Sequence, residues 1–320
     1  MRVNRRFLYW GVFLVAIGGV LVAADLAAVD STTIDDALRL WPLAIIAIGV
    51  GLILRRTRFN VAGGMLAAAM PGLLLGGAFA AAPHFSVDCG ERGEPASVST
   101  NQGAFDGPAT VSVTSGCGTL IVDTAAGSGW TFSGGNTADQ PPVITSTGNS
   151  LSIDSGVTEG WHFFDAGRDT WNLTLPTTRV DDLSLVVNAG KGQIDLAGAQ
   201  LGRVDVTTNA AETIVDVSGA SLTRLSGAVN AGLLSVHLPS GSDVTGSLTV
   251  NAGALQVCAP PGLGLRVSHD GVLSGIKVDG LQVAGSDWQS PDYASATHRA
   301  DFNVIVNVGA VEINPIGGCR

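Results

Sequence analysis

The sequence lacks the motifs that mark the common catalytic and nucleotide-binding sites. It contains no GxSxG nucleophile elbow, Walker loop, HExxH pair or dinucleotide-binding glycine fingerprint, and these motifs carry serine-hydrolase, NTPase, zinc-protease and nucleotide-dependent redox chemistry. It also has no CxxC pair and no Cys/His cluster at the spacing of metal ligands. These absences predict a protein that is not an enzyme and that holds no metal and no cofactor.

Basic residues are scarce after residue 82. Residues 83–320 contain 10 Lys/Arg and 23 Asp/Glu, a balance of −13, whereas residues 1–82 contain 7 basic and 4 acidic residues, a balance of +3. Nucleic-acid binding depends on clustered Lys and Arg that contact phosphates, so we expect no nucleic-acid partner. An acidic surface of this kind would instead attract a cationic peptide.

Charge is almost absent from three apolar blocks in the first 82 residues. The blocks cover residues 7–24, 38–54 and 61–82, and each approaches or reaches the roughly 17–25 residues that a bilayer-spanning helix needs. No later block has that length. We therefore predict a transmembrane region at 1–82, with three helices that contact the lipid bilayer.

The distribution of Arg and Asp around these blocks predicts an orientation. Arg residues precede the first block and separate the second from the third, whereas the loop between the first and second carries four Asp. The positive-inside rule then makes the N-terminus cytoplasmic and places the chain after Pro83 outside the cytoplasm. A multi-pass protein of the cell membrane is expected. The alternative is that the first block is a cleavable signal peptide, which leaves two spans and the same location for the remainder.

The second part of the chain repeats itself every 21 residues. Four copies without insertions begin at residues 186, 207, 228 and 249. Each copy contains an apolar–variable–apolar alternation typical of a half-buried strand, and its Asn and Gly mark a turn. Strand, turn, strand and turn returning in register describe one coil of a β-solenoid, which buries its apolar face against neighbouring coils. We predict an extracytoplasmic all-β domain at 105–320 with coils of about 21 residues, and a polar linker at 83–104.

An asparagine occupies the same position in every copy, and we expect these side chains to stack. Each amide would bond to the next, as in asparagine ladders, and the Gly or Ala that follows leaves room for a tight bend. Two shorter matches extend the pattern, 114–122 aligned with 188–196 and 307–314 aligned with 251–258. The predicted ladder consists of Asn188, Asn209, Asn230 and Asn251.

Two aspartates in the repeat also share one column. Asp195 and Asp216 would lie roughly 5 Å apart on adjacent coils, and paired carboxylates can serve acid/base or glycosidase chemistry. The column continues with His237 and Cys258 rather than with further acids. We therefore assign it to a solvated outer face.

Aromatic residues gather in one stretch, 159–171, of a chain that is 6% aromatic. They could form a platform for a ligand, or they could cover the open apolar end of the solenoid, since terminal coils need a cap. The candidates are Trp161, Phe163, Phe164 and Trp171.

All four cysteines lie in the part expected outside the cytoplasm, where disulfides persist. Sequence proximity favours Cys89–Cys117 and Cys258–Cys319. Four cysteines nevertheless allow three connectivities, and free thiols are the alternative.

Two stretches resemble a known group of bacterial membrane proteins. Trp10-Gly11 in the first apolar block and Leu40-Trp41-Pro42 at the start of the second resemble the transmembrane region of LiaI/LiaF-like proteins. The stretch from Trp171 to Leu201, "WNLTLPTTRVDDLSLVVNAGKGQIDLAGAQL", resembles the toast-rack or adhesin-like β domains of LiaF-type and phage-shock-related proteins. The third apolar block, the strict repeat and the four cysteines depart from that pattern.

The resemblance implies a membrane-anchored, non-enzymatic accessory protein of the cell-envelope stress response, which in some members restrains a sensor kinase. Here the partner would be a sensor kinase or another membrane protein bound through the helices, and the β domain would sense or bind an envelope ligand. The alternative function is a surface adhesin or a module that binds cell wall or polysaccharide. A third alternative is a solenoid polysaccharide lyase or hydrolase, which should show a cleft with convergent acidic or basic residues.

Overall fold

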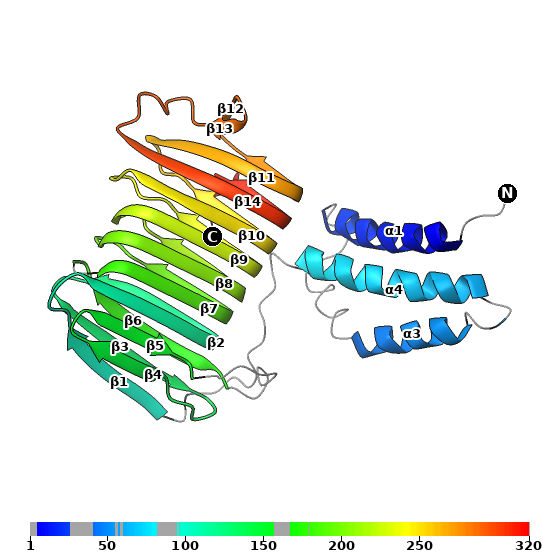
Figure 1. The fold of residues 1–320 in the computed structure, drawn as a ribbon, viewed down its shortest axis with the longest axis horizontal. Helices are drawn as coiled ribbons and strands as arrows, with labels where there is room; N and C mark the ends of the chain where they lie inside the picture. The colour runs from blue at the N-terminus through cyan, green and yellow to red at the C-terminus, as the bar shows by residue number, and fades with distance from the viewer. Residues whose placement is uncertain are drawn as a thin grey trace. The chain divides into compact units, whose positions relative to one another are not determined.

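The computed structural model describes residues 5–25, 41–54, 57, 60–81, 95, 97–156, 167–178 and 180–319. The chain forms two compact units, Met1–His84 and Phe85–Arg320, called here the helical unit and the β unit and shown in Figure 1. Each is described separately.

The helical unit contains three described helices, α1 (Arg5–Asp25), α3 (Trp41–Leu54) and α4 (Asn60–Ala81). Their bounds follow the three apolar blocks, although positions 38–40 and 82 of the predicted helices lie outside the described residues. Pro42 stands in the first turn of α3, where a missing N–H leaves no helical hydrogen bond unmade.

Small residues let α4 approach both other helices closely (Figure 1). An added Cβ at Gly64 would lie 2.3 Å from the ring of Tyr9 on α1, and one at Gly72 would lie 2.6 Å from the Phe13 carbonyl oxygen. On the other side, a Cβ at Gly51 of α3 would lie 2.8 Å from the Gly63 carbonyl oxygen. Gly51 and Gly72 therefore serve packing inside the helical unit.

None of the helices, over the residues described, combines the length and the apolar character of a membrane span. The prediction of three transmembrane helices is therefore not confirmed, although the helices themselves lie where the apolar blocks predicted them.

The β unit is a mostly β structure, and its described strands belong to one 14-stranded sheet. The strands are β1 (Ser97–Ala104), β2 (Ala109–Ala125), β3 (Gly129–Asn136), β4 (Val143–Thr147), β5 (Ser150–Asp154), β6 (Asp169–Pro176), β7 (Val180–Asp195), β8 (Gln200–Asp216), β9 (Ser221–His237), β10 (Val244–Cys258), β11 (Leu263–Val278), β12 (Gln282–Ala284), β13 (Asp287–Gln289) and β14 (His298–Ile313).

The predicted linker at 83–104 is wrong in its last part. Residues 97–104 form strand β1, which pairs antiparallel with β3. Polar, uncharged side chains at an exposed sheet edge have the same composition as a linker, so composition did not reveal the strand.

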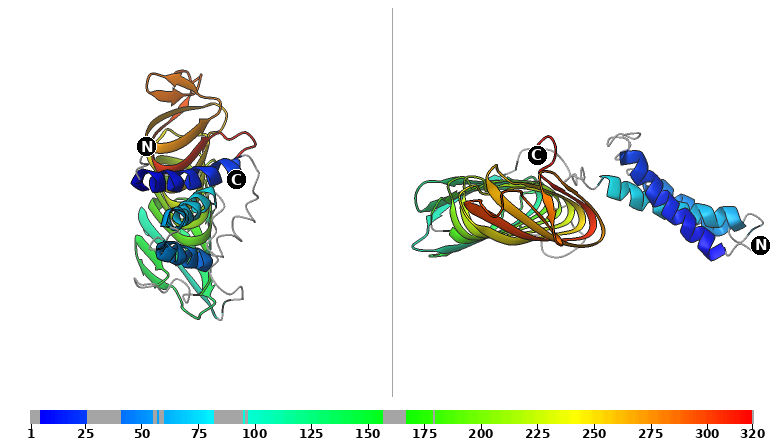
Figure 2. Two further views of the ribbon diagram at one scale, coloured as in Figure 1. Left: turned by 90° about the vertical axis from the view of Figure 1, so that its right-hand side faces the viewer. Right: turned by 90° about the horizontal axis from the view of Figure 1, so that it is seen from above.

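The centre of the sheet is a stack of parallel strands in the order β2, β7, β8, β9, β10, β14 and β11. Strands β7 to β10 pair with an offset of one repeat, as in Ala189 with Ala210 and Leu234 with Leu255. Figure 2 shows the successive coils superimposed in the view from above. The sheet runs as an open path from β1 to β12.

Each coil holds one long strand rather than the two short strands that we predicted. Strands β7 to β10 have 15–17 residues and run through the Asn-Ala-Gly position. In β7 the buried positions are odd from Leu183 to Ala189 and even from Gly190 onward. The alternation therefore shifts by one residue at the Asn-Ala-Gly bend. Because of this shift, apolar side chains point inward both before and after the bend.

The β-unit core is made of the interior columns of the coils. One such column is at most 2% exposed at every position and consists of Ile194, Val215, Val236 and Val257. The column two residues further on is equally buried at Leu196, Val217 and Leu238 and partly buried at Ala259. Such a core is assembled by stacking, because a single coil cannot cover its own apolar face.

The two outer matches of the repeat behave differently. The match of 307–314 with 251–258 agrees with the pairing of β14 with β10, for example Ala254 with Ala310. The alignment of 114–122 with 188–196 is wrong by two residues, because Cys117 pairs with Ala189 and Gly116 stands opposite Asn188. A slip of two residues keeps the same face inward, so the alternation alone did not reveal it.

Candidate functional site

The bends of the coils carry a continuous row of hydrogen-bonded asparagine amides. Asn209 Nδ2 donates to Asn188 Oδ1 at 2.6 Å, Asn230 Nδ2 to Asn209 Oδ1 at 2.6 Å, and Asn251 Nδ2 to Asn230 Oδ1 at 2.6 Å. The row begins at the carbonyl of Ser115, which accepts from Asn188 Nδ2 at 2.9 Å.

The row extends one rung further than the four asparagines of the repeat. Asn307 on β14 donates to Asn251 Oδ1 at 2.7 Å. The match at 307–314 had already aligned Asn307 with Asn251, and that alignment could have identified the fifth rung.

The ladder lies on the outside of the β unit. Asn188 and Asn209 are half-buried, whereas Asn230, Asn251 and Asn307 are exposed. Each amide has two N–H donors, of which the ladder uses one. The ladder therefore both ties the coils together and presents a row of amide donors to solvent.

Replacing a central rung should cost more than replacing an end rung. Asn209→Ala removes two amide hydrogen bonds, and Asn307→Ala removes one. At about 0.5–1.5 kcal/mol for each bond, we expect losses of roughly 1–3 kcal/mol for Asn209→Ala and roughly 0.5–1.5 kcal/mol for Asn307→Ala in the free energy of unfolding, measured by urea denaturation. Gln193→Ala, at an exposed amide on the same strand as Asn188, is the control and should change stability by less than about 0.5 kcal/mol. Equal losses at all three positions would contradict the ladder.

Asp195 and Asp216 lie in one column, as the repeat predicted. Each stands at the end of its strand, β7 or β8, and stabilises the turn that follows. Asp195 Oδ1 accepts from the Ala197 N–H at 2.9 Å, and Asp216 Oδ1 accepts from the Ser218 N–H at 2.9 Å. These are turn-forming contacts. The carboxylates are therefore occupied in holding turns on the outer face, which gives the column a structural use.

A polar cluster that the sequence did not reveal surrounds Asp169 at the start of β6. Asp169 is 3% exposed. Its Oδ2 accepts from the Gly116 N–H at 3.0 Å, and its Oδ1 accepts from Asn136 Nδ2 at 2.8 Å. Burial raises the pKa of the Asp169 carboxyl to about 6, against the lowering effect of the hydrogen bonds from Asn136 and Gly116.

The raised pKa of Asp169 predicts how stability changes with pH. The folded state holds the proton more tightly than the unfolded state, whose carboxyl has a pKa near 3.8. The stabilisation is complete below pH 3.8 and is lost as the pH rises through about 6. Relative to Asp169→Asn, the free energy of unfolding should fall by on the order of 2–3 kcal/mol between pH 4 and pH 7. Urea denaturation at each pH measures it, with Asp123→Asn at an exposed site as control. Parallel pH profiles for the wild type and Asp169→Asn would contradict the assignment.

One pair of the predicted cysteines forms a disulfide in the structure. The Cys258 and Cys319 sulfurs are bonded at 2.04 Å and join residues 61 positions apart. Cys117 is also disulfide-bonded, and Cys89 lies outside the described residues. Among the described cysteines there is no free thiol.

Trp171 is part of the core rather than a surface for a ligand. It is 1% exposed, and its ring meets Phe132 edge-on with centroids 5.6 Å apart. Its place in β6 points it inward beside Leu173 and Leu175, which are equally buried. The other three aromatic candidates, Trp161, Phe163 and Phe164, lie outside the described residues.

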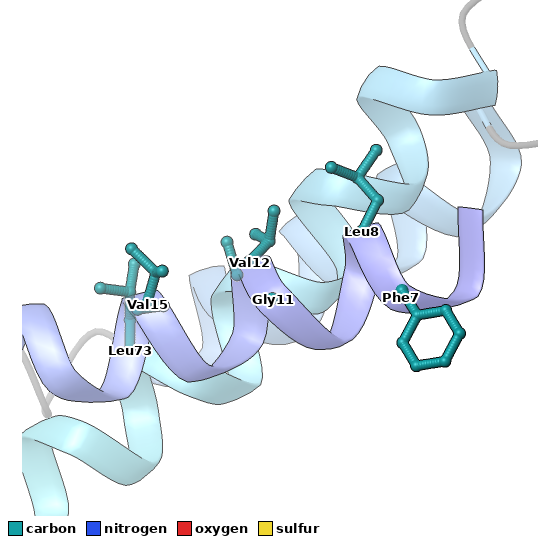
Figure 3. A pocket seen from close by; sticks show the side chains of 8 residues that line it. Phe7, Leu8, Gly11, Val12, Val15 and Leu73 are labelled. Carbon is teal, nitrogen blue, oxygen red and sulfur yellow. The ribbon is translucent and has the colours of Figure 1, made fainter. Parts of the chain in front are cut away.

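An apolar groove runs between α1 and α4 of the helical unit (Figure 3). Its volume is about 520 Å³, and its lining has no charged side chain. Exposed apolar side chains continue on all three helices, among them Val15 at 74% and Ile53 at 69%. The residues lining the groove are Phe7, Leu8, Gly11, Val12, Val15, Ala16, Ala69 and Leu73.

The glycines of the helices differ in what surrounds them. Gly11, Gly18, Gly19 and Gly49 have no atom within 4 Å of an added Cβ, so they leave space on the surface of the helical unit.

Within the residues that the structure describes, no group of three or more His, Cys, Asp or Glu could hold a metal ion.

Solved structures similar to the chain include three bacterial proteins. A protein described as a cell adhesion protein from Clostridium sporogenes is 15% identical, with 68% of this chain and 99% of that chain covered and a TM-score of 0.45. A protein described as an adhesin from Bacteroides fragilis is 9% identical (68% and 97% covered, TM-score 0.27). One described as a lipid binding protein from Parabacteroides distasonis is 12% identical (68% and 97% covered, TM-score 0.29). With all three TM-scores below 0.5, we infer neither fold nor function from them.

Two family comparisons match long parts of the sequence, whereas no curated protein matches the chain. Residues 9–93 match the LiaF transmembrane domain, which indicates membrane association, and residues 107–239 match the N-terminal domain of toast_rack. The predicted resemblance is thereby confirmed: the chain joins a LiaF-type transmembrane-domain sequence to a toast-rack β domain.

Proposed function

We propose that this protein is a non-enzymatic accessory protein of the cell-envelope stress response. In this proposal the helical unit holds the chain in the cell membrane and binds a membrane protein, such as a sensor kinase. The β unit lies outside the cytoplasm and binds an envelope ligand. The proposal rests on the LiaF and toast-rack matches together with the surface of the helical unit.

The observation that carries the proposal is the apolar surface of the helical unit. Large apolar side chains exposed there would be costly in water at about 25 cal/mol per Å², and exposed patches of this kind mark membrane or protein contacts. A helix from a membrane partner fits the apolar groove between α1 and α4, because close packing rather than charge drives association of helices in lipid.

The disulfide supports the location of the β unit. A bond between Cys258 and Cys319 is typical of a compartment outside the reducing cytoplasm.

Filling the groove tests the proposal. Gly11 lines the groove and has open space at its Cβ, so Gly11→Leu should fill the groove without disturbing the contact between α1 and α4. Gly19→Leu, on the same helix and equally open, is the matched control. A deletion strain of the native host, complemented with each variant, is challenged with a cell-wall-active antibiotic, and transcription of envelope-stress genes is measured. We expect Gly11→Leu to reproduce the deletion and Gly19→Leu to restore the wild-type response.

The second candidate is a surface adhesin or a cell-wall or polysaccharide-binding module. The exposed row of asparagine amides favours it, since unused N–H donors at regular spacing suit a polymer with repeated acceptors. If both Gly11→Leu and Gly19→Leu restore the stress response, the helical unit is a tether without a partner, and the adhesin function is then preferred.

A further inference from the structure

Three strands end the described part of the sheet. β1 lies at one end of the strand order, β12 at the other, and β4 pairs with β5 beside the main path (Figure 1). An edge strand leaves backbone N–H and C=O groups unpaired and is a template for pairing with another chain. Natural proteins protect such edges with short strands, prolines or charged side chains.

β4 and β12 carry these protections. β4 has five residues and follows Pro141 and Pro142 directly. β12 has three residues, and next to it β13 covers the start of β11 through pairs at Arg266 and Val267. The rest of β11 carries charges such as Lys277.

β1 has none of the protections within the strand itself, and the nearest proline, Pro95, lies two residues before it. It has eight residues, SVSTNQGA, with no charge and no proline. It pairs with β3 over its whole length in one unbroken register, from Ser97 opposite Asn136 to Ala104 opposite Gly129. No described residue pairs with its other side.

The backbone groups on the free side of β1 can be identified. Phe105 N–H donates to the Ser128 carbonyl at 3.0 Å, in the same antiparallel register as β1 and β3. In an antiparallel pair, bonded residues alternate, so Ser97, Ser99, Asn101 and Gly103 bond to β3. The N–H and C=O groups of the residues between them therefore face outward, namely those of Val98, Thr100, Gln102 and Ala104.

Apolar exposure and charge both point to a second copy of this chain as the partner. Val98 is 61% exposed. Val143 on β4 and Val283 on β12 are exposed to a similar degree, but those two strands are short, whereas Val98 lies on an eight-residue edge strand. Residues 83–320 carry a balance of −13, so two copies repel each other over most of their surface. β1 contributes no charge, and an uncharged antiparallel strand is complementary to itself across a twofold axis.

We propose that β1 pairs antiparallel with β1 of a second copy and joins two β units into one continuous sheet across a twofold axis. The outward N–H and C=O groups of Val98, Thr100, Gln102 and Ala104 in each copy bond to those of the other. In the dimer, the Val98 side chain of each copy is covered by β1 of the other copy. The proposal concerns the β unit alone and does not depend on the proposed role of the helical unit.

Variants at Thr100 test the pairing in the full chain, purified in detergent. Thr100→Pro removes an outward N–H and leaves the bonds to β3 intact, because edge strands tolerate proline where the N–H faces solvent. Thr100→Lys brings two like charges together across the axis. Thr100→Ala changes the side chain alone and is the control. The mass of the protein is measured by light scattering over a concentration series, together with hydrogen exchange of the β1 amides.

The expected result is a dimer whose dissociation constant rises at least ten-fold in Thr100→Pro and Thr100→Lys and less than three-fold in Thr100→Ala. In the wild type the amides of Val98, Thr100, Gln102 and Ala104 should gain protection as the concentration rises, whereas those of Ser99, Asn101 and Gly103 are protected throughout. The proposal is overturned if the outward amides exchange rapidly at every concentration, or if a dimer persists unchanged in both Thr100→Pro and Thr100→Lys, since association then occurs elsewhere in the chain.

Discussion

Replacing Gly232 by alanine is expected to destabilise the β unit by on the order of 3–4 kcal/mol. Gly232 has φ of +102°, and its added Cβ would lie 2.1 Å from the Ala211 carbonyl oxygen of the coil below. A backbone atom in a stacked coil cannot move aside as a flexible side chain can. The substitution therefore combines a strained left-handed conformation with a clash, and urea denaturation should show the loss as a lower midpoint.

Two variants separate this effect from a general sensitivity of strands to alanine. Gly275→Ala on β11 meets no atom within 4 Å and has no positive φ, so its effect should stay within about 0.5 kcal/mol. Ala211 occupies the position of Gly232 one coil earlier without a positive φ, and Ala211→Gly should cost about 1 kcal/mol. A loss for Gly232→Ala no larger than these would show that the bends are looser than described.

Removal of the disulfide should have an effect of similar size. Cys258 and Cys319 enclose β11, β12, β13 and β14 in a loop with a sequence separation of 61, and closing a loop of that length restricts the unfolded chain by roughly 4 kcal/mol. The double variant Cys258→Ser and Cys319→Ser is therefore expected to lose about 2–4 kcal/mol in urea denaturation without reductant.

A comparison with reductant isolates this disulfide from that of Cys117. Reductant should lower the stability of the wild type by more than it lowers that of the double variant, because the double variant has already lost one of the bonds. An equal response in both proteins would mean that the bond between Cys258 and Cys319 contributes nothing to stability.

The coils of β7 to β10 were predictable from the sequence because their repeat has no insertions. The interior column that begins at Ile194 recurs with β-branched apolar residues, and the observed pairing of Val215 with Val236 and of Val236 with Val257 is the alignment of the repeat itself. The asparagine row follows from the same periodicity.

The order of the last strands is a tertiary property. β14 lies between β10 and β11, although β11 follows β10 in the chain, and a repeat read locally predicts sequential stacking. The sequence held one signal, since the stretch at 307–314 matches β10 with its asparagine intact. β11 has Val272 at the aligned position and no asparagine.

The polar cluster could not be predicted from local pattern. The buried Asp169 carboxylate accepts hydrogen bonds from two other strands. The Gly116 N–H donates from β2, and the Asn136 side-chain amide donates from β3. These residues are far apart in the sequence and share no motif. Trp171 shows the opposite case, because its inward position follows from the alternation with Leu173 and Leu175, which the aromatic content of the stretch had obscured.

For the helical unit, amino-acid composition predicts the positions of the helices but not the contacts between them. Apolar runs predicted where α1 and α4 lie, because a long run without charges favours a helix in an apolar setting, even with the glycines and Pro71 of α4. Which glycines face a neighbouring helix depends on the packing of Tyr9 and Phe13 against α4, and a pattern of small residues does not determine this.

The central claim is that the helical unit holds the chain in the membrane with the β unit outside the cytoplasm. Gln193 is exposed on β7, and Gln193→Cys adds a thiol for a membrane-impermeant maleimide. The measurement is labelling of this variant in intact spheroplasts, followed by an alkaline wash of the membranes. We predict that the thiol is labelled in intact spheroplasts and that the labelled chain stays with the membrane pellet. Labelling that requires permeabilised membranes, or release of the chain by the wash, would contradict the claim.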